Sequence, residues 1–167
     1  MQVRQGRFDD LGAVMEMVRR VVPLMRESGN LQWDDEYPNL AAFERDVENG
    51  QLWVAEIEGA LAGFAAITTD QQAEYHDAGM DTSEEAIVVH RLLVDPAFRG
   101  KGAAAALMLQ AEVVAKERGI AVLRVDTSKQ NEATQRLFPK LGYRLAGEIG
   151  FDFRPGMRFL CYEKRLT

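Results

Sequence analysis

Positions 99 to 102 combine two cations with two residues that lack a Cβ atom, in the order Arg99-Gly100-Lys101-Gly102. An apolar pattern with helical spacing follows at once. The first turn of a helix carries backbone N–H groups with no internal partner, and the helix dipole adds partial positive charge there. Glycine allows a phosphate to approach the backbone closely. These residues therefore predict a site for a phosphate or pyrophosphate group.

Two regular elements must position this loop. Residues 87 to 94 form a largely apolar, β-branched run that stops at Asp95-Pro96, which is typical of a buried strand. The following helix is expected to turn one face inward and to pair Glu112 with Lys116 on the outer face. The expected inward residues are Ala104, Leu107, Met108, Ala111, Val114 and Ala115. An ordinary turn that starts a helix is the alternative, but the strand, the cations and the alanine-rich first turn favour phosphate binding.

Three types of phosphate loop compete for this segment. The Walker A pattern fails because Gly102, rather than Ser or Thr, follows Lys101. The dinucleotide fingerprint is matched by Gly100, Gly102 and Ala105, with Asp126 near the expected acidic position. That fingerprint, however, places its first glycine directly after the strand, whereas several residues intervene here.

The third pattern fits best. Arg99-x-x-Gly102-x-Ala104, after the strand, resembles the acyl-CoA pyrophosphate loop of the GNAT (Gcn5-related N-acetyltransferase) superfamily. The resemblance continues downstream at Asn131, Leu137, Lys140, Gly142 and Tyr143. It implies a mixed α/β fold, with a central, mostly antiparallel sheet of about six to seven strands, a V-shaped parallel splay and about four flanking helices. It also implies one acetyltransferase domain over residues 1–167.

The resemblance implies transfer of an acetyl group from acetyl-CoA to a primary amine by direct attack. Leu92, Leu93 and Val94 would contact the cofactor through the main chain, where a backbone N–H could act as an oxyanion donor. Their side chains are equally expected for a sheet core, and Asn131 could be a plain helix cap. The implied cofactor-binding residues are Leu92, Leu93, Val94, Arg99, Gly100, Lys101, Gly102, Ala103, Ala104, Asn131 and Phe138.

His90 occupies the position at which many superfamily members carry a glutamate base. Histidine titrates near neutral pH, so it could take a proton from an ammonium group directly or through water. A structural histidine inside the sheet is the alternative, and then Glu56 or a chain of water molecules could serve as the base. Arg91, expected on the opposite face of the strand, is either structural or a contact for a substrate anion.

Phe138 departs from the superfamily pattern, which commonly has tyrosine as the general acid at this position. Phenylalanine cannot donate a proton. Either the thiolate leaves unassisted, or another group such as Tyr162 or Cys161 lies nearby, or the site is degenerate. The last case would make the protein a non-catalytic acyl-CoA-binding module, and a dinucleotide-dependent enzyme is the weaker rival.

Trp33 and Tyr37 lie in a segment expected to link two helices, among Asp34, Asp35 and Glu36. Each aromatic ring alone is best explained as part of the core. Together with the carboxylates they could form a mouth that selects an amine through cation–π and ionic contacts. They are therefore the predicted substrate-binding residues, for a small-molecule or peptide amine.

The bulk composition narrows the class of protein. At 167 residues and a net charge of -6, the chain can bury a core and is a poor candidate for nucleic-acid binding. Cys161 is the only cysteine, and no apolar run is long enough to span a membrane. No secretion signal is expected, because residues 1–10 lack an apolar segment. We expect a cytoplasmic protein without a membrane partner or a metal site, and the resemblance allows a homodimer.

The remaining pattern predicts the elements around the loop. We expect a helix from about residue 11 that Pro23 kinks or ends, and a second helix capped by Asn39 with Leu40, Phe43 and Val47 inward. Residues 69–85 are expected to form a solvated acidic loop. Further expected strands are 2–6, 52–57, 61–68, 120–125, 143–149 and 159–165, and a helix is expected over 131–141.

Overall fold

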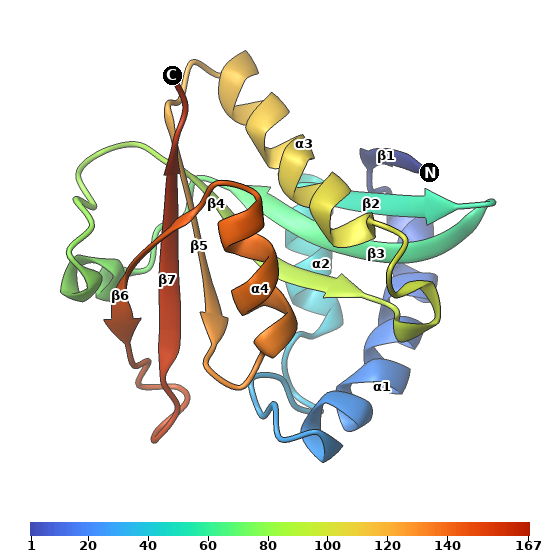
Figure 1. The fold of residues 1–167 in the computed structure, drawn as a ribbon. Helices are drawn as coiled ribbons and strands as arrows, with labels where there is room; N and C mark the ends of the chain where they lie inside the picture. Colours follow the sequence, from blue (N-terminus) through green and yellow to red (C-terminus); the bar gives the residue numbers. More distant parts are fainter. The chain divides into compact units, whose positions relative to one another are not determined.

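The computed structural model describes the whole chain, Met1 to Thr167, and contains one seven-stranded sheet (Figure 1). Hydrogen-bonded neighbours follow the order β1-β2-β3-β4-β5-β7-β6. The sheet is mostly antiparallel, and β4 and β5 form a parallel pair. This architecture confirms the predicted mixed α/β fold. None of the helices combines the length and apolar character needed to span a bilayer.

The chain divides into two compact units, each built from separated stretches of sequence. The first unit contains Met1–Ile67 and His90–Gln110, and the second contains Thr68–Val89 and Ala111–Thr167. The division passes through β4 and through α3, so both elements contribute to both units. The single domain expected from the sequence stays a prediction.

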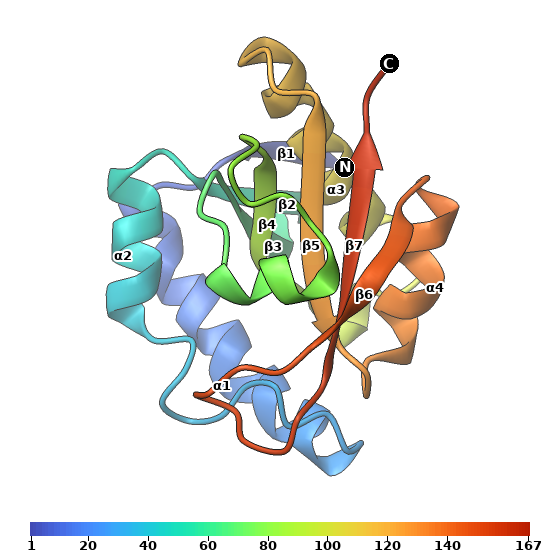
Figure 2. The same ribbon diagram turned by 90° about the vertical axis from the view of Figure 1, so that its left-hand side faces the viewer.

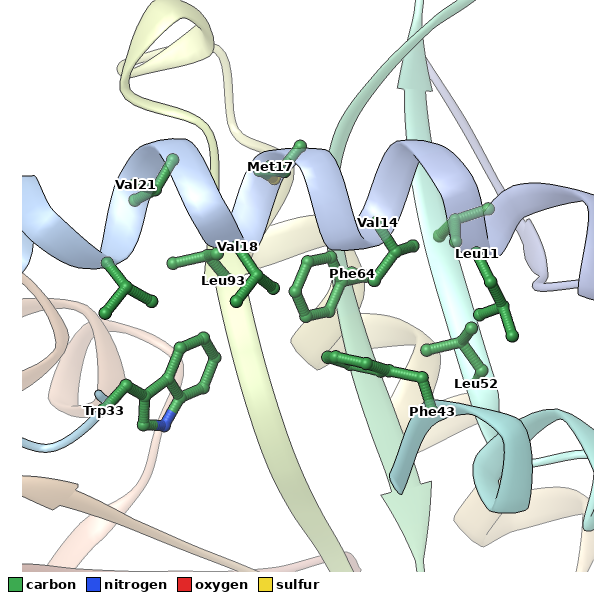
Figure 3. Close-up of a cluster of buried hydrophobic side chains, with 12 residues drawn as sticks. Leu11, Val14, Met17, Val18, Val21, Trp33, Phe43, Leu52, Phe64 and Leu93 are labelled. Atoms are coloured by element: carbon green, nitrogen blue, oxygen red, sulfur yellow. The ribbon is translucent and has the colours of Figure 1, made fainter. Parts of the chain in front are cut away.

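Two helices pack on one face of the strands in the first unit. Its elements are β1 (Gln2–Gln5), α1 (Leu11–Glu27), α2 (Leu40–Glu48), β2 (Leu52–Ile57), β3 (Ala60–Thr68) and the second half of β4 (Ile87–Val94). Figure 3 shows the α1 residues Leu11, Val14 and Val18 above Phe43 of α2 and Phe64 of β3. The two phenylalanine rings meet edge to face, with 5.2 Å between their centroids. Burial of this cluster holds both helices against the sheet.

Two outcomes are expected at Pro23, a kink or the end of the helix. The second is wrong, because α1 continues to Glu27. The backbone donor that proline lacks would have bonded to the carbonyl of Arg19, and Arg19 faces solvent, where water can replace the bond. In α2, Leu40 is exposed, and its place on the inner face is taken by Asp46.

The second unit places two helical segments on opposite faces of three strands. Its elements are the 3-10 helix η2 (Ala73–Ala78), β5 (Val122–Ser128), α4 (Glu132–Lys140), β6 (Arg144–Ile149) and β7 (Phe159–Arg165). Residues Ile87–Val89 of β4 pair in parallel with Leu123–Val125 of β5. Figure 2 shows η2 on one side of β5, β7 and β6 and α4 on the other. Consecutive residues of β7 therefore face different helical segments.

The segment 69–85 is not the solvated loop that its acidic composition predicts. Tyr75 of η2 is fully buried, and its hydroxyl donates a hydrogen bond of 2.5 Å to Oδ2 of Asp126. Arg124 of β5 is also fully buried, bonds to Glu163, and donates to the backbone carbonyl of Asp81 at 2.9 Å. A buried arginine on the neighbouring strand thus binds this segment to the sheet.

Glu112 of α3 (Ala103–Glu117) pairs with Lys164 of β7 at 3.1 Å, and not with Lys116 as expected. The same Lys164 amine donates to the carbonyl of Leu141 at 2.7 Å. The expected inner face of α3 is otherwise largely confirmed. Its buried apolar residues are Ala103, Leu107, Met108, Ala111 and Ala115.

Two buried tyrosines provide a matched test of hydroxyl energetics. The Tyr75 hydroxyl is bonded to Asp126, whereas the Tyr143 hydroxyl is buried without any hydrogen-bond partner. We expect Tyr75→Phe to lower the free energy of unfolding by about 1.5–3 kcal/mol, because a hydrogen bond to a carboxylate is lost. Tyr143→Phe should be neutral or stabilising by about 1 kcal/mol, because it removes an unsatisfied group. Urea denaturation of both variants measures the difference, and equal losses would contradict it.

Candidate active site

The loop predicted to bind phosphate joins β4 to α3 through a short 3-10 turn, η3 (Pro96–Phe98). Gly100 and Gly102 have φ angles of 80° and 83°, in the left-handed region that side chains disfavour. A Cβ atom added at Gly100 would meet nothing within 4 Å, and one at Gly102 would meet only the end of Met1 at 3.8 Å. Both glycines are therefore required by backbone conformation and leave the outer surface of the loop open.

Five backbone N–H groups at the start of α3 have no acceptor within the protein. Ala106 is the first residue to donate back into this turn, to the carbonyl of Gly102 at 2.9 Å. The exposed side chains of Arg99 and Lys101 form no ion pair. The residues whose N–H groups lack an acceptor are Gly100, Gly102, Ala103, Ala104 and Ala105. Free N–H groups, a helix N-terminus and two unpaired cations together fit a pyrophosphate group.

Asp95 holds the start of this loop in place. Its carboxylate accepts two hydrogen bonds from Arg20 of α1, at 2.7 and 3.2 Å, and one from the backbone N–H of Ala97 at 2.9 Å. Its own N–H donates to the carbonyl of Ala62 in β3 at 2.8 Å. The bonds from Arg20 lower the pKa of the buried Asp95 carboxyl. The loop is therefore tied to both α1 and β3.

His90 is half-buried in β4 and is followed by a residue with an unusual backbone. Arg91 has a φ of 53°, one of only two such values outside glycine in the chain. Its guanidinium forms two bonds with the carboxylate of Asp46, of 2.6 and 2.8 Å, and donates to the hydroxyl of Tyr37 at 3.1 Å. The alternative base, Glu56, forms a close ion pair with Arg4, so its carboxylate is already engaged.

The acetyltransferase (GNAT) family model matches residues 18–143, which is more than half of the chain. The chain belongs to the GNAT acetyltransferase family. Membership confirms the class expected from the loop, and acetyl-CoA is the cofactor that this class uses.

Two curated relatives match part of this GNAT protein. The L-2,4-diaminobutyric acid acetyltransferase of Streptomyces coelicolor is 41% identical over 75 residues, which are 42% of this chain and 44% of that protein. The N-acetylaspartate synthetase of Danio rerio is 28% identical over 106 residues, or 64% of this chain and 34% of that protein. The matched region therefore spans less than half the length of either relative.

Solved structures resemble the chain over nearly its whole length. A GNAT-family acetyltransferase from Streptococcus agalactiae has a TM-score of 0.82 at 26% identity, covering 99% of this chain and 95% of that one. The structure of yncA from Salmonella typhimurium with its cofactor acetyl-CoA has a TM-score of 0.69 at 21% identity, covering 100% and 94%. These similarities confirm the GNAT fold. The dinucleotide-binding alternative has no support, since Asp126 is bonded to Tyr75 and the sheet is mostly antiparallel.

The side chains of the predicted cofactor strand are divided between the core and the surface. Leu93 belongs to the buried cluster around α1, whereas Leu92 and Val94 are half-buried. A Cβ atom added at Gly63 of β3 would lie 2.7 Å from the carbonyl oxygen of Leu93. Gly63 therefore permits a close approach of the two strands, and any cofactor contact at these positions would use the main chain.

The second unit contains the remaining predicted residues of the GNAT site. Asn131 caps α4, where its side chain accepts a bond of 3.2 Å from the N–H of Thr134. Phe138 is buried, and the ring of Tyr162 packs edge to face on it with centroids 5.4 Å apart. Cys161 instead lies in the cluster on the η2 side, where burial raises the pKa of its thiol. Of the two groups considered as replacement acids, only Tyr162 lies beside Phe138.

Trp33 and Tyr37 belong to the same apolar region but differ in burial, since Trp33 is a core residue and Tyr37 is only partly buried. Trp33 is 4% exposed and lies beneath α1 in the core, as Figure 3 shows. Asp34 accepts hydrogen bonds from the backbone N–H groups of Glu36 and Tyr37, so it shapes the turn. This arrangement supports the core role that the sequence also allowed for Trp33. Tyr37 reaches Arg91 instead.

Sequence reasoning missed the residues that hold the site together. Arg20 and Asp95 are 75 residues apart, and Asp46 and Arg91 are 45 residues apart. The only signal in the sequence was a charged residue, Asp46, at an inward helical position. Such a position implies a buried partner but does not identify it.

The Asp95–Arg20 pair predicts a defined acid dependence of stability. The pKa of Asp95 is lowered on folding, so the pair stabilises the protein above the ordinary aspartate pKa of about 3.9 and the effect is lost as pH falls. We expect Asp95→Asn to lower the melting temperature at neutral pH, with the difference from wild type shrinking below about pH 4. The exposed Asp9→Asn is the control and should show no such trend. A difference that is independent of pH would contradict the assignment.

Proposed function

We propose that this protein is an N-acetyltransferase that moves an acetyl group from acetyl-CoA to a primary amine by direct attack. The observation that carries the proposal is the loop from Arg99 to Ala104. Its free N–H groups, left-handed glycines and unpaired cations suit a pyrophosphate at the start of α3. Family membership supports the acetyl-CoA assignment.

In this proposal, the loop and the end of β4 hold the cofactor. Arg99 and Lys101 add charge to the free N–H groups of Gly100 and residues 102 to 105, and the main chain of Leu92 to Val94 contacts the rest of the cofactor. Asn131 and Phe138 are proposed as further contacts, as the family resemblance implies. Bound acetyl-CoA supplies a thioester, whose sulfur is a tolerable leaving group.

His90 is the proposed base that takes the proton from the acceptor ammonium, directly or through water. It sits in β4, close in sequence to the loop, and Glu56 is occupied by Arg4. Tyr162, beside Phe138, is the proposed proton source for the leaving thiolate. Burial raises the pKa of its phenol, which keeps the proton on the oxygen at neutral pH.

The proposed acceptor is a small amine. The names of the two curated relatives refer to L-2,4-diaminobutyric acid and to N-acetylaspartate, both small molecules. The net charge of -6 is compatible with a cationic or neutral acceptor. The burial of Trp33 removes it from the proposed acceptor site and leaves Tyr37.

A glycine substitution tests the loop. Gly102→Ala should cost about 1–2 kcal/mol in strain and weaken acetyl-CoA binding at least tenfold, because the added Cβ atom would occupy the open surface of the loop beside the free N–H groups. Gly119→Ala, at the other end of α3, is the matched control. Its φ of 69° imposes similar strain, and its Cβ atom would also meet nothing within 4 Å.

Acetyl-CoA should raise the melting temperature of the wild type and of Gly119→Ala, but much less that of Gly102→Ala. Both variants should lose similar stability in the absence of ligand. If acetyl-CoA stabilised none of the three proteins, the central proposal would fail. Stabilisation by NAD instead would revive the dinucleotide alternative.

Removal of the proposed base tests the chemistry. His90→Gln should lower kcat/KM for thiol release with an amine acceptor by about 100-fold, while acetyl-CoA still raises the melting temperature. His76, the other histidine, is exposed on η2, and His76→Gln should retain full activity. An unchanged rate in His90→Gln would exclude it as the base. Cofactor binding by the wild type without thiol release on a broad amine panel would favour a non-catalytic binding module.

A further inference from the structure

We propose that Tyr37 and Arg91 bind a carboxylate group of the acceptor, so that the substrates are amino acids rather than simple amines. The inference rests on the proposed acetyltransferase function and adds the chemical class of its acceptor. It is carried by a cluster in the first unit, formed by Tyr37, Asp46 of α2 and Arg91 of β4.

The polar groups of this cluster that have no partner in the protein are hydrogen-bond donors. A guanidinium has five N–H groups. Arg91 uses three of them, two on Asp46 and one on Tyr37, and one on each terminal nitrogen remains. The Tyr37 hydroxyl accepts from Arg91, and its own proton has no acceptor in the protein. Three donors therefore remain unfilled, which matches a carboxylate and not an ammonium group.

Asp46 orients the Arg91 guanidinium, but its own carboxylate is not available to bind a substrate. It is 3% exposed, and each of its oxygens already accepts a bond from Arg91. It balances the charge of Arg91 and fixes the plane of the guanidinium from one side. A guanidinium held in this way loses little conformational entropy when a second carboxylate binds.

The backbone of Arg91 supports a functional role. A φ of 53° lies in the left-handed region and strains an arginine backbone in a way that a glycine would avoid. A left-handed residue also interrupts the alternation of a strand, so Arg91 need not point away from the face used by His90. The two residues are consecutive, with Cα atoms about 3.8 Å apart.

This proximity limits the acceptor. A molecule held by its carboxylate at Arg91 would present its amine to His90 on the adjacent residue, so the proposal favours acceptors in which a short chain separates the two groups. Free amino acids meet this condition, with the reacting amine on the α-carbon or on a short side chain. The N-terminal residue of a protein has its α-carboxyl group in a peptide bond, so protein N-termini are disfavoured.

The test compares amino acids with the amines that remain when their carboxylate is removed. Suitable pairs are L-lysine and cadaverine, L-ornithine and putrescine, and L-alanine and ethylamine. The wild type should show at least a tenfold higher kcat/KM for thiol release with the preferred amino acid than with its paired amine. Tyr37→Phe should reduce this preference about tenfold, by raising KM for the amino acid and leaving the amine unaffected.

Tyr143→Phe is the matched control, because it removes a hydroxyl in the second unit that bonds to nothing. It should leave the preference unchanged. Arg91→Lys, which keeps the charge but loses the planar fork, should abolish the preference. A role for Tyr37 in folding alone would instead lower the rates for both members of a pair by the same factor and would overturn the inference.

The outcomes separate the inference from the function on which it rests. Turnover of amines and amino acids at equal kcat/KM would refute only the carboxylate site. If no acceptor released thiol, the acetyltransferase proposal would fail, and binding would decide the inference. L-lysine should then raise the melting temperature of the CoA-saturated wild type more than cadaverine does, and Tyr37→Phe should lose this difference; an equal effect of both would overturn the carboxylate site.

Discussion

The carboxylate of Asp95 connects the parts of the first unit on which the proposed cofactor binding depends. It lies at the end of β4, accepts two bonds from Arg20 of α1, and caps the turn that leads to the glycines. A helix cannot satisfy the N–H groups of its own first turn, so those groups at the start of α3 are available to a ligand. Their direction is set by the preceding turn, which Asp95 holds. The charge pair thus acts on function by orienting a backbone and contributes no ligand contact itself.

The eight residues of β4 have three different structural roles. Ile87 to Val89 pair with β5, Leu93 packs in the core beneath α1, and His90 and Arg91 are placed between them. Arg91 departs from strand geometry, and the ion pair with Asp46 stabilises a side chain whose backbone is strained. A strained residue held by buried partners is typical of functional sites, because strain elsewhere would be lost without consequence. Leu93, in the same strand, has an ordinary backbone and packs in the core, whereas the strained Arg91 is the residue proposed to bind substrate.

The second unit satisfies nearly all of its buried polar groups, and the exception is informative. Arg124 has no exposed surface and uses its donors on Glu163, Glu84, Gln71 and a backbone carbonyl. Tyr143 alone buries a hydroxyl without a partner, beside the Phe138 ring. Phe138 and Tyr162 meet on the α4 side of the strands, and Cys161 lies on the η2 side, because consecutive strand residues face opposite ways. The phenol that could replace the missing tyrosine therefore comes from β7 and not from α4.

The sequence alone determined the features that depend on near neighbours. The caps at Asn39 and Asn131 and the bounds of β7 follow from local backbone chemistry, and the structure confirms them. The structure decided which distant charges meet. Asp46 with Arg91, Arg20 with Asp95 and Glu112 with Lys164 are separated by 45 to 75 residues. The structure also shows that Trp33 is buried in the core and that the Tyr37 hydroxyl accepts a hydrogen bond from Arg91. A local pattern indicates that a buried charge needs a partner, but many residues can serve, and only packing of the whole unit selects one.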